Sequence, residues 1–218
     1  MVRETRAYRC HAISEDIGSI TLDTVLVEDP GPGEVQINVK ACSVNFPDLL
    51  MIQGKYQFKP PLPFAPGGEA SGDVVVVGSD VSGVEVGDRV VFGSRHGCFA
   101  ERLNVSADAI NAIPGSMTYA KAASYGTAYQ TAYVALTHRG NLQPDEWLMV
   151  HGATGGVGMA AVDIGKHLGA RVIGTGGTDA KLAVVKSRGA DEVINYTQVD
   201  GSLGGFRDRV KSITGTGG

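Results

Sequence analysis

Cysteine is scarce in this sequence, with three residues among 218, and long apolar runs are missing. Cys10, Cys42 and Cys98 lie far apart and form no CxxC pair, so neither a disulfide framework nor a clustered-cysteine metal site is expected. No apolar run approaches the roughly 18 residues that a membrane-spanning helix needs. Residues 1–10 also lack the apolar region of a signal peptide. These absences predict a cytoplasmic protein that does not enter the membrane.

Strong charge is missing as well. The sequence has 19 basic and 23 acidic residues, a formal net charge of −4, and no block of Lys or Arg. Binding to nucleic acid is therefore not expected, because it depends on a concentrated basic surface. Glycine, by contrast, is in excess: 31 residues, or about twice its usual share. Since 43% of the residues are hydrophobic, this composition predicts a folded protein with many turns and close backbone approaches.

The first half of the chain has the pattern of short β-strands. Residues 35–39 alternate apolar and polar side chains, as a half-buried strand does. Further strands are expected at 74–77, 89–92 and 99–105, with Gly and Pro turn signals between them. This spacing predicts a small barrel or sandwich, which forms a first domain over residues 1–125.

After this domain the pattern changes to alternating strands and helices. Strands are expected at 147–150, 171–174 and 193–194. Between the first two, apolar residues recur at helical steps of three and four, and Gly169 is expected to end that helix. Such alternation is typical of an α/β domain with a parallel sheet and crossover helices. Residues 126–218 are therefore expected to form the first part of a dinucleotide-binding domain.

A glycine-rich segment separates the first strand of this second domain from its first helix. It matches the dinucleotide fingerprint G-x-G-x-x-G, with Ala153, Gly155 and Gly158 at the key positions. The middle glycine lets a pyrophosphate approach the backbone, the last allows close helix–strand packing, and the helix N-terminus supplies free N–H groups. The strand before and the helix after provide the context that the motif requires. The alternative is a tight strand–helix turn with no ligand.

The end of the second strand indicates which dinucleotide is bound. NAD-binding domains place an acidic residue there to hold the ribose 2′-hydroxyl, whereas this chain has Gly-Thr-Gly-Gly-Thr at 174–178. Asp179 comes late and is expected in the first turn of the next helix. Lys181 can meet a 2′-phosphate as a point charge, unless it is an ordinary solvated lysine. The missing acid favours NADP(H) over NAD.

Segments in both halves of the chain carry a family resemblance: 44–45, 87–90, 131–136, 141–144, 152–158 and 189–196. In this register the chain resembles the zinc-independent NADPH:quinone oxidoreductases of the zeta-crystallin type, members of the medium-chain dehydrogenase/reductase superfamily. The resemblance implies a GroES-like β-barrel domain followed by a Rossmann-type parallel α/β domain. Since the related proteins are longer, it also implies that the chain is truncated at the C-terminus and that the intact protein is a homodimer.

The resemblance also assigns site residues one by one. Asn45 stands where zinc dehydrogenases of this superfamily have their first catalytic cysteine, and it is expected at the catalytic and cofactor site. Thr131, rather than the similar Thr127, matches the threonine near the nicotinamide. Lys181 and Tyr196 match contacts to the 2′-phosphate, although Tyr196 alone would be interpreted as an ordinary strand-end residue. The pyrophosphate loop is matched by Gly155, Gly156, Val157 and Gly158.

A catalytic zinc ion is not expected in this chain. Gly67-Gly68-Glu69 replaces the Gly-His-Glu of the zinc enzymes, and Asn45 replaces a cysteine ligand. A structural Cys₄ site is also excluded, because it needs four closely spaced thiolates. Asp48, close to Asn45, is a candidate for lining the cleft, but the expectation is that it is an exposed loop acid.

Without zinc or an evident acid–base pair, the chemistry is expected to come from the cofactor. NADPH would pass hydride to a quinone or an enone, which is the small-molecule partner that we expect. Tyr56 is a candidate proton donor, because a phenol with a pKa of about 10 holds its proton at neutral pH. Its segment resembles that of enoyl-thioester reductases, but Tyr56 would equally pack beside Phe58. Three hypotheses stay open: a quinone reductase, an enone or enoyl-thioester reductase, and a non-catalytic nucleotide-binding relative.

Overall fold

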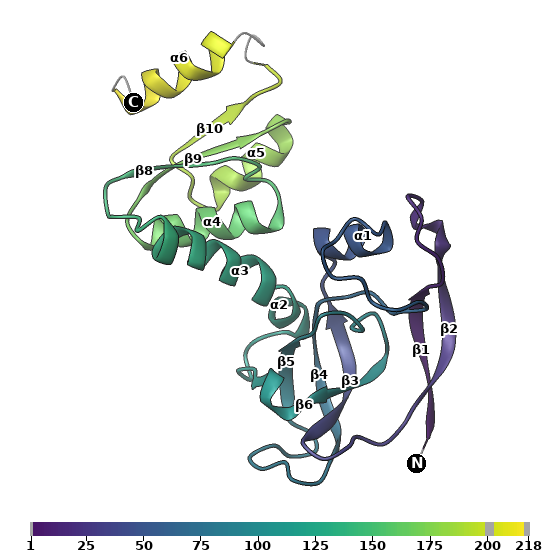
Figure 1. Cartoon of the computed structure of the whole chain (residues 1–218). Coiled ribbons are helices and arrows are strands. Elements are labelled where there is room, and N and C mark those ends of the chain that lie inside the picture. The colour runs from purple at the N-terminus through teal and green to yellow at the C-terminus, as the bar shows by residue number, and fades with distance from the viewer. Residues whose placement is uncertain (1, 199–202, 216–218) are drawn as a thin grey trace. The chain divides into compact units, whose positions relative to one another are not determined.

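The chain forms two compact units, residues 1–126 and 127–218 (Figure 1). The structure is a computed structural model that describes residues 2–198 and 203–215. As the sequence predicts, the first unit consists mainly of β-strands and the second contains a parallel sheet with helices. No helix in the described part of the chain is long and apolar enough to span a membrane.

An antiparallel sheet of five strands forms the centre of the first unit. Its strands are β3 (Glu34–Cys42), β4 (Glu69–Val77), β5 (Arg89–Gly93), β6 (Arg102–Ser106) and β7 (Ile110–Ala112). They lie in the order β6-β3-β4-β5-β7. The predicted strands at 35–39, 74–77 and 89–92 are confirmed, within β3, β4 and β5.

The strand expected at 99–105 begins only at Arg102. The backbone just before it bonds elsewhere: the Gly97 N–H donates to the Ala65 carbonyl at 2.8 Å, and the Phe99 N–H to the Pro66 carbonyl at 2.9 Å. These bonds hold residues 97–99 against the loop that precedes β4, whereas the Glu101 carbonyl already accepts the Val39 N–H of β3 at 2.9 Å.

Alternate side chains of the sheet form the core of the first unit. Val35 and Ile37 on β3, and Val90 and Phe92 on β5, are buried at the two-residue spacing of a strand face. Their burial supplies hydrophobic stabilisation in proportion to the apolar area removed from water. The full cluster is Val35, Ile37, Ala70, Val74, Val90, Phe92, Cys98 and Val105.

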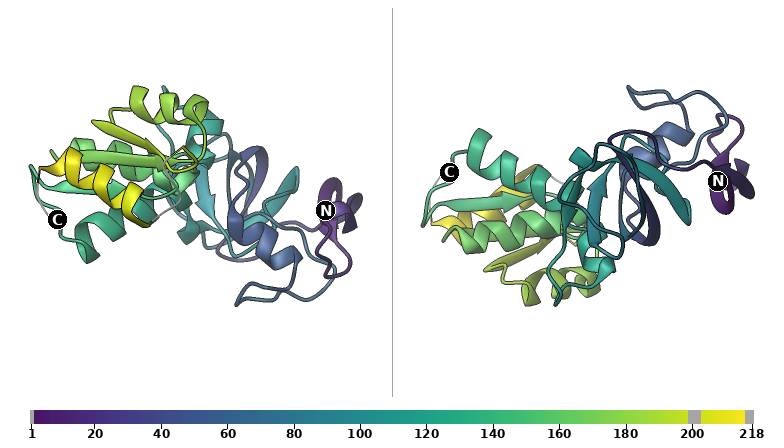
Figure 2. Two further views of the ribbon diagram at one scale, coloured as in Figure 1. Left: turned by 90° about the horizontal axis from the view of Figure 1, so that it is seen from above. Right: turned by 90° about the horizontal axis from the view of Figure 1, so that it is seen from below.

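A hairpin of β1 (Arg3–Cys10) and β2 (Ile20–Val27) lies beside this sheet (Figures 1 and 2). The Tyr8 N–H attaches it to the segment before β6 by donating to the Phe99 carbonyl at 2.8 Å. The sequence pattern does not indicate this hairpin, because buried positions of β1 hold the small residue Ala7 and the polar residue Thr5.

Helices of the first unit are short. Helix α1 (Phe46–Ile52) buries Met51 and Ile52 in a second apolar cluster with Cys10 and Phe64. Asn45 is the N-cap residue of this helix, so the packing of α1 also fixes the position of Asn45. Helix α2 and two 3₁₀ turns complete the unit, at Tyr119–Ala123, Ile17–Ser19 and Ala107–Ala109.

The second unit contains three parallel strands in the order β10-β9-β8. This is the strand order of the first half of a doubly wound dinucleotide-binding fold. Strands and helices alternate along the chain as β8 (Trp147–Val150), α4 (Gly156–His167), β9 (Arg171–Gly176), α5 (Asp179–Ser187), β10 (Glu192–Asn195) and α6 (Leu203–Thr214). The predicted strands at 147–150, 171–174 and 193–194 are confirmed, as is the end of the first crossover helix just before Gly169, which has φ +85°.

Helix α3 (Gly126–Tyr133) precedes this sheet and continues into a π-helical segment, Val134–Arg139. Its Tyr129 hydroxyl donates to the Asp163 carboxylate on α4 at 2.5 Å. This hydrogen bond ties α3 to the helix that follows the glycine-rich segment.

Candidate functional site

The glycine-rich segment connects β8 to the N-terminus of α4. Gly155 is the N-cap residue and α4 begins at Gly156, so the first N–H groups of this helix have no partner within the helix. Ala153 is fully buried, and its N–H donates to the Thr175 carbonyl on β9 at 3.0 Å. The loop is therefore attached to the sheet beneath it, and the helix N-terminus offers N–H donors and a positive dipole end to an anion.

Gly158 and Gly155 have different surroundings within this loop. A Cβ on Gly158 would lie 2.3 Å from the Gly152 carbonyl oxygen and 2.8 Å from the Ala153 Cα, so the close packing predicted at this position is present. A Cβ on Gly155 would approach Gly152 only to 3.5 Å. The fold requires glycine at 158, whereas glycine at 155 leaves the outer side of the loop open. Val157, which directly precedes Gly158, is 43% exposed.

Asp179 lies in the first turn of α5, as the sequence predicts, rather than at the end of β9. Its carboxylate accepts hydrogen bonds from Asn195 Nδ2 at 2.6 Å and from Gln198 Nε2 at 2.7 Å. These bonds lower the pKa of Asp179. Among the described residues, the acid that follows this strand end is thus committed to contacts with the segment after β10.

Lys181 and Tyr196, the residues matched to the 2′-phosphate, are both exposed. Tyr196 follows β10, and its hydroxyl oxygen lies 3.1 Å from the position of a Cβ built on Gly177. The tyrosine thus lies against the turn that follows β9. Lys181 lies on α5, one turn after that same β9–α5 connection, and has no hydrogen bond or ion pair among the residues with described positions.

Thr131 is exposed on α3. One turn earlier on the same helix, the Ala128 Cβ lies 3.9 Å from the position of a Cβ on Gly156. Residues three apart on a helix are neighbours, so α3 places Thr131 one turn away from the start of α4.

His151 lies beside the glycine-rich segment, although its place in the sequence does not by itself predict a role. It follows β8 directly, its Nδ1 lies 3.4 Å from the hydroxyl of Thr175, and its ring lies 5.9 Å from the ring of Phe206 on α6. The available signal was its place immediately before the glycine loop, but a residue in that place is equally an ordinary strand-end residue.

In the first unit, Asn45 is the centre of a hydrogen-bond network. Its Nδ2 donates to Ser43 Oγ at 2.8 Å and to Glu69 Oε1 at 3.0 Å, and Ser43 Oγ donates to the same Glu69 oxygen at 2.5 Å. Glu69 is only 3% exposed. The predicted site residue Asn45 is therefore held by Ser43 and Glu69, which the sequence motifs do not assign to the site.

The prediction that Asp48 is an exposed loop acid is wrong, because this side chain is 2% exposed. Its carboxylate accepts hydrogen bonds from the N–H groups of Asn45 at 2.7 Å and of Gly67 at 3.2 Å. Burial raises the pKa of Asp48, and the charge of Glu69 raises it further, against the lowering effect of the two backbone bonds. Asp48 thus joins the start of α1 to the loop before β4.

Two cysteines lie near these acids. Burial raises the pKa of Cys98 to about 12, with smaller contributions from Cys42 and the two acids. Burial also raises the pKa of Cys42. Both residues therefore remain thiols at neutral pH, whereas a metal ligand or nucleophile must be a thiolate. In the part of the chain with described positions, no group of three or more His, Cys, Asp and Glu residues is arranged to hold a metal ion.

Tyr56, the candidate proton donor, packs against the apolar cluster under α1. Phe58 packs on the same cluster, which is the alternative expected from the sequence. Among the described residues, no hydrogen bond fixes the hydroxyl of Tyr56. Packing of the ring and proton donation by the hydroxyl are compatible, so the role of Tyr56 stays a prediction.

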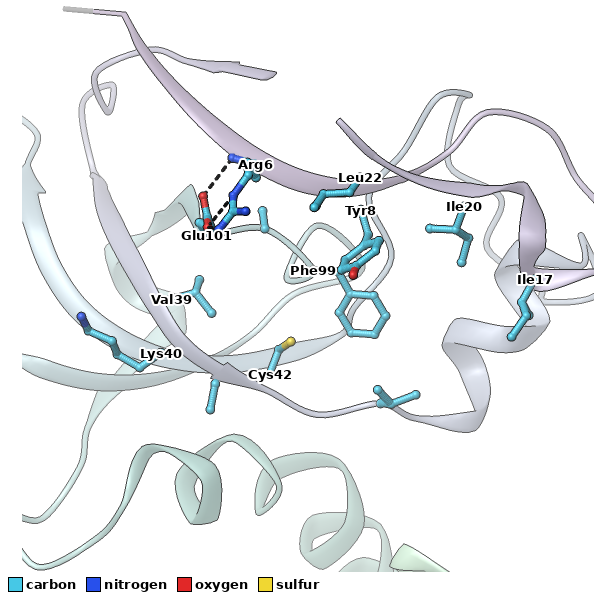
Figure 3. Close-up of a pocket in the computed structure, with 13 residues that line it drawn as sticks. Arg6, Tyr8, Ile17, Ile20, Leu22, Val39, Lys40, Cys42, Phe99 and Glu101 are labelled. Carbon is cyan, nitrogen blue, oxygen red and sulfur yellow. Dashed lines mark hydrogen bonds and ion pairs between the residues drawn. The ribbon is translucent and has the colours of Figure 1, made fainter. Parts of the chain in front are cut away.

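A pocket of about 720 Å³ lies within the first unit, between the β1–β2 hairpin and β3 (Figure 3). The rings of Tyr8 and Phe99 and the sulfur of Cys42 line it, and the hydrogen-bonded pair Arg6–Glu101 lies at its side. The mostly apolar lining suits an apolar group better than a phosphate. Neither Asn45 nor Tyr56 lines this pocket.

Two family models match successive parts of the chain. A model of the alcohol dehydrogenase GroES-like domain matches residues 31–143, and a model of the zinc-binding dehydrogenase family matches residues 156–218. Quinone oxidoreductase-like protein 2 of Mus musculus is 39% identical over 214 residues, which are 98% of this chain and 60% of that protein. The Homo sapiens synaptic vesicle membrane protein VAT-1 homolog is 39% identical over 189 residues, 86% of this chain and 47% of that protein.

A solved structure shows the same arrangement of elements. The crystal structure of Escherichia coli quinone oxidoreductase complexed with NADPH matches with a TM-score of 0.87 at 34% identity, over 96% of this chain and 63% of that one. The chain spans 60% or less of the length of the two curated relatives above.

Proposed function

The chain belongs to the medium-chain dehydrogenase/reductase superfamily, with a GroES-like first unit and a Rossmann-type second unit. From this membership we propose that the protein functions as an NADPH-dependent oxidoreductase. The acceptor that we propose is a quinone or another conjugated carbonyl compound. The observation that carries the proposal is the loop before α4, where Gly158 packs against Gly152 and Gly155 leaves the outer side open.

The loop and its surroundings fit a dinucleotide. In this proposal the N–H groups of Gly156, Val157 and Gly158 bind the pyrophosphate at the positive end of α4, and Gly155 lets it approach the backbone. The E. coli quinone oxidoreductase was crystallised with NADPH, which supports the same cofactor here.

The proposed preference for NADPH rests on the end of β9. The nearby acid Asp179 is bonded to Asn195 and Gln198, so no carboxylate of the described residues is left at the strand end to hold a ribose 2′-hydroxyl. Lys181 supplies a positive charge beyond that end, and the Tyr196 hydroxyl lies against Gly177. These two residues would bind the 2′-phosphate.

When bound, NADPH supplies the hydride, and the residues of the chain bind and orient the reactants. Asn45 and Thr131 are the residues that we propose at the nicotinamide end. Asn45 is partly exposed, and its amide is held in place by Ser43 and Glu69. A fixed polar group of this kind orients a ligand without the cost of ordering a mobile side chain.

We propose that the reaction proceeds without zinc. Asn45 stands where the zinc dehydrogenases have a cysteine ligand. Its amide nitrogen donates a hydrogen bond to Glu69, so this position holds a hydrogen-bond donor instead of a thiolate. Cys98 and Cys42 are stabilised as thiols rather than as thiolates. These residues do not fit a zinc ion, which prefers thiolate, imidazole and carboxylate ligands.

The cellular location and the oligomeric state are also parts of this proposal. Three unpaired cysteines suit a reducing cytoplasm, and we propose that location together with a homodimeric intact protein. Sedimentation of the intact protein would show a single species of twice the chain mass, and a monomer at micromolar concentration would refute the dimer.

The experiment that tests the function is an NADPH-consumption screen at 340 nm with quinones, enones and enoyl thioesters, using the intact protein. Quinone-dependent oxidation of NADPH supports the proposal. Faster oxidation with enones, lost in Tyr56→Phe, favours the enone reductase with Tyr56 as proton donor. Tight NADPH binding with no acceptor-dependent oxidation favours a non-catalytic nucleotide-binding protein.

A further inference from the structure

We infer that Glu69 is a positioning residue, which orients the side-chain amide of Asn45 so that only its carbonyl oxygen is available to a ligand. The inference rests on the proposed function in one respect, namely that Asn45 meets the cofactor or the acceptor. Glu69 itself is buried and acts through Asn45.

The hydrogen bonds determine which way the amide faces. A carboxylate only accepts hydrogen bonds, so the part of Asn45 that lies 3.0 Å from Glu69 Oε1 must be the NH₂ group. Ser43 gives its own hydrogen to the same carboxylate oxygen at 2.5 Å, and its oxygen then accepts the second Asn45 hydrogen at 2.8 Å. Both N–H hydrogens are used. The amide oxygen faces the Asp48 N–H in the capping box at the start of α1, and its second lone pair is left for a ligand.

Glu69 is held firmly enough to impose this orientation. It begins β4, its backbone carbonyl accepts the Ser43 N–H at 3.3 Å, and its side chain is 3% exposed. On the far side of the carboxylate, a Cβ on Gly126 would lie 2.7 Å from Glu69 Oε2. Glycine at 126 therefore leaves the space that the carboxylate occupies. The backbone of Asn45 is fixed separately, by its bond to Asp48 at 2.7 Å.

A fixed carbonyl oxygen selects a ligand group that donates a hydrogen bond. A primary carboxamide and a hydroxyl are such groups. In the proposed reaction the first belongs to the nicotinamide ring and the second to the hydroquinone product. An amide turned by 180° would present N–H groups instead and would favour carbonyl oxygens. Glu69 thereby determines which polarity of ligand group Asn45 recognises.

The test compares Glu69→Met with Glu69→Gln. Methionine has a similar length but no acceptor, whereas glutamine keeps an oxygen that can accept from Asn45 and Ser43. The first readout is the side-chain NH₂ signal of Asn45 in ¹H–¹⁵N spectra, assigned with Asn45→Leu. Slow hydrogen exchange of this signal is expected in the wild type and in Glu69→Gln, and fast exchange in Glu69→Met.

The second readout is the affinity for NADPH relative to its 3-acetylpyridine analogue, which has no carboxamide N–H. If Asn45 accepts from the carboxamide, the wild type prefers NADPH by about tenfold, roughly the value of one hydrogen bond, and Glu69→Met loses most of this preference. If it accepts from the product instead, the preference is absent, and inhibition by a hydroquinone weakens about tenfold in Glu69→Met.

Gly126→Ala provides a perturbation that leaves Glu69 unchanged. Its methyl group would displace the carboxylate, so the Asn45 signal is expected to exchange faster than in the wild type, although both partners are present. This variant keeps the inference testable if Glu69→Met does not fold.

Slow exchange of the Asn45 signal in a folded Glu69→Met protein would overturn the inference, and so would a loss of protection in Glu69→Gln equal to that in Glu69→Met. Failure of the proposed function is seen separately, as a wild type that binds neither NADPH nor its analogue while the Asn45 signal still depends on Glu69.

Discussion

Gly158 packs so closely on Gly152 that a Cβ on Gly158 would lie 2.3 Å from the Gly152 carbonyl oxygen. The atom that it would meet belongs to the backbone, so it cannot turn away as a flexible side chain would. This contact brings the first turn of α4 against the loop after β8 and gives the loop its shape.

The variant Gly158→Ala is therefore expected to lower the free energy of unfolding by about 1–3 kcal/mol, the usual cost of overpacking, and to abolish NADPH binding. Gly155→Ala is the matched control for stability, since its Cβ would have no atom closer than 3.5 Å. It should leave unfolding nearly unchanged but still weaken NADPH binding, because the pyrophosphate approaches at this position. Urea titration and NADPH fluorescence measure the two effects. Equal destabilisation by both alanines would contradict this account of the loop.

Lys181→Ala is expected to weaken NADPH binding about tenfold and to leave NADH binding unchanged, because a lost hydrogen bond to a charged phosphate costs roughly this much. Lys121→Ala, which removes an exposed lysine from α2 in the first unit, is the control. Dissociation constants for both cofactors in all three proteins provide the measurement. An equal loss of affinity for NADPH and NADH would show that Lys181 does not contact the 2′-phosphate.

The sequence alone predicts the second unit better than the first. Alternating strands and helices with terminal glycines depend on local patterns, so the parallel sheet and the end of α4 before Gly169 are recovered. The β1–β2 hairpin is missed, because Thr5 and Ala7 at its buried positions produce no apolar alternation.

The site is predictable only where local motifs describe it. The glycine loop is found because its residues are consecutive. The contacts of Asn45 with Glu69 and of Asp48 with Gly67 join residues 24 and 19 positions apart, and such pairs become visible only when the loops are folded together. The same separation explains why Asp48, which looks like a loop acid, is buried.

A further prediction concerns the Asp191 carboxylate, which joins β10 to the rest of the second unit. It accepts from Lys166 Nζ at 2.7 Å and from the Val172 N–H at 2.6 Å. Burial alone would raise the pKa of Asp191, but Lys166 and the Val172 N–H lower it overall. Because the folded-state pKa is depressed, this stabilisation is present above the unfolded value of about 3.9 and is lost as pH falls through the folded value.

Asp191→Asn is thus expected to lower the free energy of unfolding by about 1 kcal/mol at pH 7, an amount reduced by partial exposure to solvent. The difference from the wild type should disappear at acidic pH. Glu15→Gln is the control, because the Glu15–Lys55 pair is exposed and its loss should leave stability unchanged. An Asp191→Asn effect that is independent of pH would mean that the hydrogen-bond geometry matters and the charge does not.

Asp48 should show the opposite pH dependence. Burial raises its pKa in the folded state, so the folded protein binds this proton more tightly than the unfolded chain does. Stability from this group is therefore greatest below the unfolded pKa of about 3.9 and declines as pH rises through the higher folded value.

The variant Asp48→Asn does not titrate. Its side chain has one oxygen instead of two, so it can accept only part of the hydrogen bonding from the N–H groups of Asn45 and Gly67. The variant is expected to be less stable than the wild type at acidic pH, with the difference becoming smaller as pH increases towards 7. Urea unfolding of both proteins across this range tests the sign, and a difference that grows with pH would show that the Asp48 pKa is lowered by its two N–H donors.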